Sequence, residues 1–155
     1  MTTIALVDDE NSIRTSVSLA LESEGFKVDV FQNGIEALEA LESKSYDLGL
    51  FDIKMPKMDG NELLAKVRSS KNNDLKEMPI IFLTSKDQEQ DEIIGLRMGA
   101  ADYITKPFSQ KLLNERIRTV LRIYKNRKAP NNHANKDLKN LKKGNLELDD
   151  LKQLC

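Results

Sequence analysis

Five side chains that could take part in phosphoryl chemistry each stand at the end of a short run with strand character. They are, in chain order, Asp8, Asp9, Asp52, Thr84 and Lys106. An aspartate carboxylate can attack a phosphoryl group, and an ammonium and a hydroxyl can stabilise the charge on its oxygens. Crowded carboxylates repel one another unless a cation lies among them, and magnesium suits such oxygen ligands. If the fold brings these residues together, they form a magnesium-dependent phosphoryl-transfer site.

Each of these residues alone has an ordinary structural explanation. An aspartate such as Asp9, placed between a strand and a helix, commonly caps the helix. Lys106 precedes a proline and fits a loop, and Thr84 suits a strand end because threonine is β-branched. The recurrence of such residues at successive strand ends is what favours a shared chemical site.

The apolar pattern predicts the elements that would position these residues. The expected strands are 4–7, 26–30, 48–51, 80–83 and 102–105, and the expected helices are 10–24, one that Asn33 caps, 60–69, 87–98 and 109–124. This alternation predicts an α/β fold, a (βα)5 doubly wound parallel five-stranded sheet. Ligands bind at the carboxyl ends of the strands in such sheets, which is where the five side chains fall.

Helix boundaries also have local signals. Gly25 and Gly99 are expected to end helices, and Asn33 and Ser109 to begin them.

Composition indicates one globular domain with an appendage. The chain has 155 residues, of which 39% are hydrophobic and 32% charged. No apolar run is long enough to span a bilayer and the N-terminus lacks signal-peptide features, so a cytoplasmic location without membrane contact is expected. Its single cysteine, Cys155, excludes an internal disulfide. The net charge of −1 combines an acidic body with a basic C-terminal end, which fits a solvated linker or a polyanion-binding tail.

Four segments resemble the signature motifs of response-regulator receiver domains, which have a flavodoxin-like fold. They are VDDE (7–10), FDIKMPKMDG (51–60), FLTS (82–85) and GAADYITKPF (99–108). The resemblance covers about residues 2–124. Within receivers, the chain is most similar to the winged-helix (OmpR/PhoB) class, and there to ChvI-like regulators.

The resemblance implies a role for each matched position. Asp52 matches the aspartate that accepts a phosphoryl group from a sensor histidine kinase. The remaining matches are Asp9 as a direct Mg²⁺ ligand, Asp8 as a ligand through water, Lys54 as a backbone carbonyl donor to the metal, Thr84 and Tyr103 as switch residues, and Lys106 as the ion-pair partner of the acyl phosphate. The Lys106–Pro107 bond matches one that is cis in the family.

The resemblance also implies an output. In the winged-helix class, phosphorylation strengthens a symmetric homodimer that aligns two DNA-binding domains and controls transcription. Asp102 and Arg116 match a cross-dimer ion pair of that class. The positions that depart from its paired charges are Glu92, Ala101, Leu112 and Ile123.

Three segments follow from these expectations: a receiver domain at 1–124, a linker at 125–143, and the start of a truncated winged-helix effector domain at 144–155. DNA would be bound only through the missing part of that effector domain. The protein is therefore expected to be a phosphoacceptor signalling domain and not an enzyme acting on other substrates.

Three other protein classes share some of these features. A haloacid-dehalogenase-type phosphatase also uses an aspartate nucleophile, but it needs an acid two residues later, where this chain has Lys54. A stand-alone receiver would bind a partner protein directly, and the segment 144–150 argues against it. A nucleotide-binding switch would need a glycine-rich phosphate loop, and none follows any expected strand.

Overall fold

The computed structural model describes residues 1–85 and 87–128, and it divides the chain into two compact units, Met1–Leu121 and Arg122–Cys155. The first unit contains one parallel sheet in the order β2-β1-β3-β4-β5. Its strands are β1 (Thr3–Val7), β2 (Lys27–Phe31), β3 (Leu48–Asp52), β4 (Ile80–Thr84) and β5 (Asp102–Thr105). The predicted five-stranded doubly wound sheet is thus confirmed.

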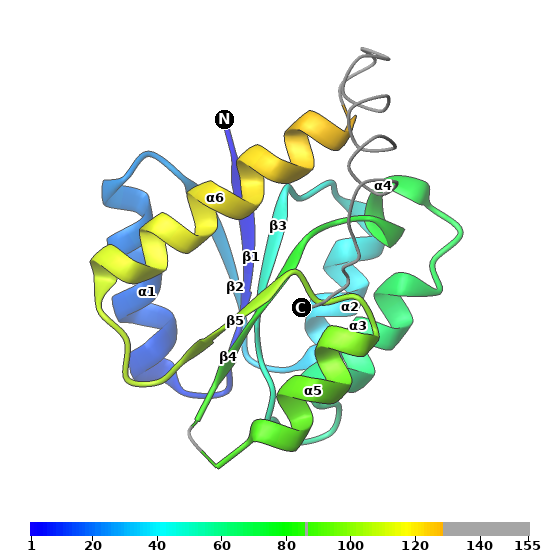
Figure 1. The fold of residues 1–155 in the computed structure, drawn as a ribbon, viewed down its shortest axis with the longest axis horizontal. Helices are drawn as coiled ribbons and strands as arrows, with labels where there is room; N and C mark the ends of the chain where they lie inside the picture. Colours follow the sequence, from blue (N-terminus) through cyan, green and yellow to red (C-terminus); the bar gives the residue numbers. More distant parts are fainter. Residues whose placement is uncertain (86, 129–155) are drawn as a thin grey trace, which may run out of the picture. The chain divides into compact units, whose positions relative to one another are not determined.

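Helices alternate with the strands and cover both faces of the sheet. They are α1 (Asn11–Ser23), α2 (Gly34–Ser43), α3 (Gly60–Arg68), α4 (Asn73–Lys76), α5 (Glu89–Arg97) and α6 (Gln110–Lys128), the last of which continues into the second unit. Within the first unit, α1 and the start of α6 lie on one side of the sheet, and α2, α3 and α5 lie on the other (Figure 1).

The three central strands are apolar on both faces. Every residue of β3 and β4 is buried, as are residues 4–7 of β1. Successive side chains of a strand point to opposite faces, so Val7, Phe51 and Phe82 join one core cluster with residues of α2 and α3. Their neighbours in sequence face the other helix layer. Burial on both faces is why these segments read as continuous apolar runs.

The predicted helix boundaries are confirmed at four positions. The Asn33 side chain accepts a hydrogen bond from the Glu36 amide at 2.9 Å, and Ser109 Oγ accepts one from the Leu112 amide at 3.0 Å. Gly25 and Gly99 follow α1 and α5 with φ values of +94° and +103°, the left-handed conformation that glycine favours at helix ends.

One additional helix and one longer helix differ from the sequence-based expectations by more than a residue or two. The short helix α4 was not predicted; the Asn72 side chain caps it by accepting hydrogen bonds from the Asp74 and Leu75 amides. Helix α6 runs to Lys128, past the expected end near Tyr124, so the first residues of the predicted linker are helical. The rest of that linker and the segment 144–155 lie outside the described residues. Among the described helices, none is long and apolar enough to cross a membrane.

Candidate functional site

The carboxyl ends of β1 and β3 bring three aspartates together. The two strands are neighbours with Val7 opposite Phe51, so Asp8 and Asp52 follow side by side. Asp8 is fully buried and Asp52 is 5% exposed, while Asp9 is exposed. The three residues offer carboxylate oxygens that all lie within 4.8 Å of one another. The predicted convergence of these acids is confirmed.

Lys106, which follows the edge strand β5, also reaches this cluster. Its Nζ lies 2.9 Å from Asp8 Oδ2 and 3.4 Å from Asp52 Oδ1, and the backbone amide of Lys106 donates to the Thr84 carbonyl. The Lys106–Pro107 bond is cis, as the resemblance implied. Residues nearly a hundred positions apart in sequence therefore form one ion-pair network.

In this network, the positive charge of Lys106 does not fully compensate the negative charges of Asp8 and Asp52. The pKa of Asp52 is raised to about 7, mainly by burial and next by the charge of Asp8, while the charge of Lys106 opposes both. Burial lowers the pKa of Lys106, but the hydrogen bond to Asp8 and the charge of Asp52 outweigh burial, so the net pKa is raised. Lys106 therefore stays an ammonium, whereas Asp52 with protein groups alone is partly protonated near neutral pH.

A divalent cation fits this imbalance. Three carboxylates of which one is exposed form a hard oxygen site that opens to solvent, and magnesium typically keeps several waters and takes only one or two carboxylates. The Lys54 side chain is not directed to this cluster, because its Nζ pairs with Asp91 Oδ2 on α5 at 3.2 Å. That pairing is compatible with a contribution from Lys54 through its backbone only.

Thr84 and Tyr103 lie on the β4–β5 side of the site. Thr84 is fully buried, and its hydroxyl lies 3.0 Å from Gln88 Oε1, 3.2 Å from Glu92 Oε2 and 3.2 Å from the Ser85 carbonyl. Tyr103, on the edge strand β5, is 37% exposed. The structure thus places the two predicted switch residues on neighbouring strands, with the hydroxyl of Thr84 tied to α5.

Gln88 and Glu92 were missed as contacts of Thr84. Glu92 is only 9% exposed, although the sequence suggests a solvated acid in the first turn of a helix. The one signal in the sequence was that Glu92 departs from the paired charges of the winged-helix class. Asp102 and Arg116, predicted as a pair across a dimer, form an ion pair of 2.8 Å within this chain.

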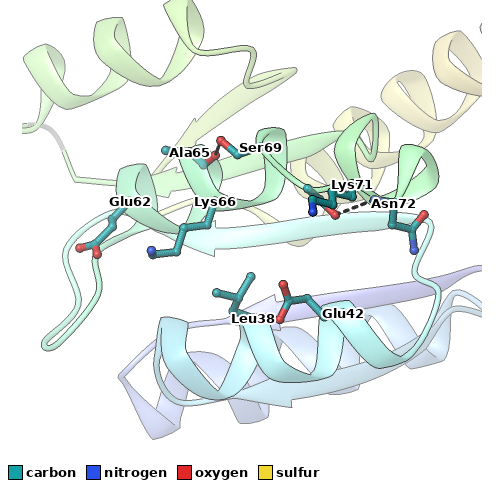
Figure 2. Close-up of a pocket in the computed structure, with 9 residues that line it drawn as sticks. Leu38, Glu42, Glu62, Ala65, Lys66, Ser69, Lys71 and Asn72 are labelled. Atoms are coloured by element: carbon teal, nitrogen blue, oxygen red, sulfur yellow. Dashed lines mark hydrogen bonds between the residues drawn. The ribbon is translucent and has the colours of Figure 1, made fainter.

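One surface cavity of the structure does not belong to this site. It measures about 730 Å³ and lies between α2 and α3, where Leu38 and Glu42 face Glu62 and Lys66 (Figure 2). Its lining includes none of the predicted site residues. This cavity and the acidic cluster are therefore separate features of the structure.

A doubly wound parallel sheet with an acidic cluster and a lysine at its strand ends defines a class of phosphate-directed α/β proteins. Comparison with known families makes the assignment specific: residues 4–118 match the model of the response regulator receiver domain. The chain belongs to this family, and the matched segment lies within its first unit. The family match excludes the phosphatase and nucleotide-switch alternatives.

Relatives extend the comparison. The alkaline phosphatase synthesis transcriptional regulatory protein PhoP of Bacillus subtilis is 42% identical over 77% of this chain and 48% of its own length. The chain spans about half the length of the curated relatives it matches.

Solved structures share the fold. The chemotaxis protein CheY4 of Vibrio cholerae is 32% identical, with a TM-score of 0.72 over 77% of this chain and 98% of its own. The receiver domain of the sensor histidine kinase PA1611 of Pseudomonas aeruginosa is 29% identical, with a TM-score of 0.71 over 77% and 97%. That domain holds a magnesium ion in its active-site cleft.

Proposed function

We propose that Asp52 accepts a phosphoryl group from the phosphohistidine of a sensor histidine kinase, with Mg²⁺ bound by Asp8, Asp9 and Asp52. The observation that carries this proposal is the ammonium of Lys106, which bridges Asp8 and Asp52 inside the acidic cluster. A purely structural aspartate would have no need of a partly buried lysine and two further carboxylates around it. The receiver family supports the same role, because such domains are phosphorylated by sensor histidine kinases.

The proposed transfer is a substitution at phosphorus. An Asp52 carboxylate oxygen forms a bond to phosphorus, the bond from phosphorus to the histidine nitrogen breaks, and the released imidazole takes up a proton. A bound divalent ion would offset the charge of Asp52 and of a phosphoryl oxygen. Lys106, already 3.4 Å from Asp52, is placed to pair with a second oxygen, and the Thr84 hydroxyl can donate to a third once it leaves α5.

The proposed output is transcription control. The relatives with the same receiver include proteins named as transcriptional regulators, and they are about twice as long as the matched segment. We therefore assign 1–124 to the receiver, 125–143 to a linker, and 144–155 to the start of a winged-helix domain of the OmpR/PhoB class, similar to ChvI-like regulators. A stand-alone receiver is the alternative, and the coding sequence beyond Cys155 distinguishes the two.

Intact-mass measurement with acetyl phosphate tests the chemical assignment. With Mg²⁺, wild type should gain one phosphoryl group and release acetate, while Asp52→Asn should gain none. Asp74→Asn is a matched control, because Asp74 is an exposed aspartate on α4, and it should be modified like wild type. Efficient modification of Asp52→Asn, or of wild type in excess chelator, would contradict the proposal.

A further inference from the structure

The buried carboxyl of Glu92 is the unusual feature of α5. Glu92 is 9% exposed, and its Oε2 lies 3.2 Å from the Thr84 hydroxyl. Within residues 1–85 and 87–128, Thr84 is the only side-chain partner that the structure gives this carboxyl. A buried carboxyl group depends on its hydrogen-bond partners, because an unsatisfied one loses its hydration without compensation.

The same helix has few apolar anchors. Its buried residues are Glu92 and Gly95, whereas Ile93, Ile94 and Leu96 are between 43% and 47% exposed. Gly95 allows close packing on β4, because a Cβ at this position would clash with the Phe82 ring. Polar contacts therefore contribute an unusually large share of the attachment of α5 to the sheet.

Several of those polar contacts cluster on one turn of α5. Besides Glu92, the side chain of Asp91 pairs with Lys54, and the Asp91 carbonyl accepts a hydrogen bond of 3.5 Å from Asn61 Nδ2. Both Lys54 and Asn61 follow β3, the strand that carries Asp52. The segment that follows Asp52, up to the first turn of α3, therefore contacts α5 directly.

The Thr84 hydroxyl can satisfy only one acceptor with its proton. In the structure the acceptors within reach are Gln88, Glu92 and the Ser85 carbonyl, and none of the hydrogen bonds that the described residues make with Thr84 reaches Asp52. A phosphoryl oxygen on Asp52 would compete for that proton. If the Thr84 hydroxyl donates to the phosphoryl oxygen instead, the Glu92 carboxyl loses the hydrogen bond that this hydroxyl gave it.

We infer that Glu92 is a positioning residue that links Thr84 to α5: it holds the hydroxyl away from Asp52 before phosphorylation, and it releases α5 when the hydroxyl is withdrawn. This inference rests on the proposed phosphoacceptor function of Asp52. The release follows because an unpaired buried carboxyl favours conformations in which it regains water. With so few buried apolar side chains, α5 moves at lower cost than the other helices on its side of the sheet.

Hydrogen exchange of the full chain without any phosphoryl group tests the link itself. Glu92→Ala should speed exchange of the α5 amides about tenfold, which corresponds to loss of one hydrogen bond to a charged or polar group, and leave α3 amides unchanged. Glu89→Ala removes an exposed glutamate from the same helix turn and should leave α5 exchange unchanged. Glu92→Gln retains an acceptor oxygen and should restore most of the protection.

A double-mutant cycle connects the contact to the phosphoryl state. Thr84→Ala and Glu92→Ala should show a coupling in α5 exchange in the free protein, and that coupling should vanish when Mg²⁺ and beryllofluoride occupy Asp52. Glu92→Ala should bind beryllofluoride about 3- to 10-fold more tightly, because the hydroxyl is then held by fewer acceptors.

The outcomes separate the two proposals. If Glu92→Ala and Glu89→Ala show the same α5 exchange, or if the cycle shows no coupling in the free protein, the link is wrong even when Asp52 is phosphorylated normally. If the coupling persists unchanged with beryllofluoride bound, Thr84 does not leave Glu92 and the release is wrong. If wild type fails to bind beryllofluoride at Asp52, the phosphoacceptor function itself fails.

Discussion

The β3–α3 unit (48–68) and the β4–α5 unit (80–97) are neighbours that start alike and end differently. Both begin with a strand that is buried at every residue and ends in a site residue, Asp52 or Thr84. Helix α3 then buries Leu63, Leu64 and Val67, and the Asp59 side chain caps it. Helix α5 buries only Glu92 and Gly95, and it has no side-chain cap.

This difference separates two ways of holding a helix on a sheet. Apolar burial holds α3 whatever the charge state of the site, because it does not depend on a particular partner atom. Polar contacts hold α5, and those contacts include the hydroxyl that a phosphoryl group would attract. On the proposed function, the unit that carries Asp52 is therefore expected to stay in place, and the neighbouring β4–α5 unit is expected to move.

The largest expected effect is a contrast in stability between the two helices. Leu64 is fully buried on α3, so Leu64→Ala should lower the free energy of unfolding by about 2–5 kcal/mol. Ile94 is 47% exposed on α5, so Ile94→Ala should change it by less than about 0.5 kcal/mol. Urea unfolding of both variants measures the difference. Equal losses would show that α5 is anchored by apolar packing after all.

A second effect concerns the charge of Asp52 in the β3–α3 unit. The pKa of Asp52 is raised from 3.8 to about 7, so the folded state binds its proton more tightly than the unfolded state. Stability from this group is therefore present below about pH 4 and is lost as the pH rises through 7. In chelator, Asp52→Asn should exceed wild type in stability by about 4 kcal/mol at pH 8, and by little at pH 4.

Thermal or urea unfolding at several pH values measures that difference. The Asp74→Asn variant serves as the control, because Asp74 is exposed on α4 and lies outside the acidic cluster. A gap between Asp52→Asn and wild type that is independent of pH would mean that Asp52 is not buried as an uncompensated charge.

The sequence predicted the strands and site residues of the β3–α3 unit, but it did not predict the side-chain contacts of the β4–α5 unit. The buried strands appear as apolar runs, and the three aspartates and Lys106 appear at strand ends, because a parallel sheet imposes both patterns. The contact between Thr84 and Glu92 leaves no such pattern. An acid in the first turn of a helix is favoured by the helix dipole whether it is exposed or buried, so its spacing does not reveal its contacts.

Long-range pairs were equally hidden from the sequence. Arg118 on α6 pairs with Glu24 after α1 at 2.9 Å, and only the packing of the two helices brings these residues together. The capped turn at α4 was missed for another reason. It is too short for helical periodicity, and it is held by the Asn72 cap and the buried side chain of Leu75.

A third effect concerns Mg²⁺ binding at the acidic cluster of Asp8, Asp9 and Asp52. Bound Mg²⁺ should raise the free energy of unfolding by about 1.4 kcal/mol at a concentration tenfold above its dissociation constant. Asp9→Ala should abolish this response, and should leave the metal-free protein equally or more stable because it removes repulsion. Calorimetry with and without Mg²⁺ measures both. Since the N-cap of α1 is Glu10 without a side-chain cap bond, loss of stability in metal-free Asp9→Ala would require another role for Asp9.

The smallest effect concerns the surface beside the β4–α5 unit. The sequence resemblance predicts that phosphorylation strengthens a twofold homodimer through α5, β5 and α6, with Asp102 of one copy paired to Arg116 of the other. In the structure these residues pair within one chain, both partly exposed, and Ile93, Ile94 and Leu112 stand exposed on the same elements. A symmetric contact could exchange the pair between copies without changing the number of ion pairs.

Such an exchange makes the expected contribution of charge small. Exposed ion pairs are worth about 0–1 kcal/mol each, so apolar burial would supply most of the dimer's stability. Arg116→Glu should weaken the beryllofluoride-bound dimer up to about fivefold, and adding Asp102→Lys should restore part of the loss. Arg118→Glu is the matched control on the same helix, because its partner Glu24 lies after α1. In sedimentation velocity, equal weakening by Arg116→Glu and Arg118→Glu, or a wild type that stays monomeric with beryllofluoride, would place the dimer contact elsewhere. If only Arg116→Glu weakens the dimer, the dimer contact lies on α5, β5 and α6, beside the β4–α5 unit.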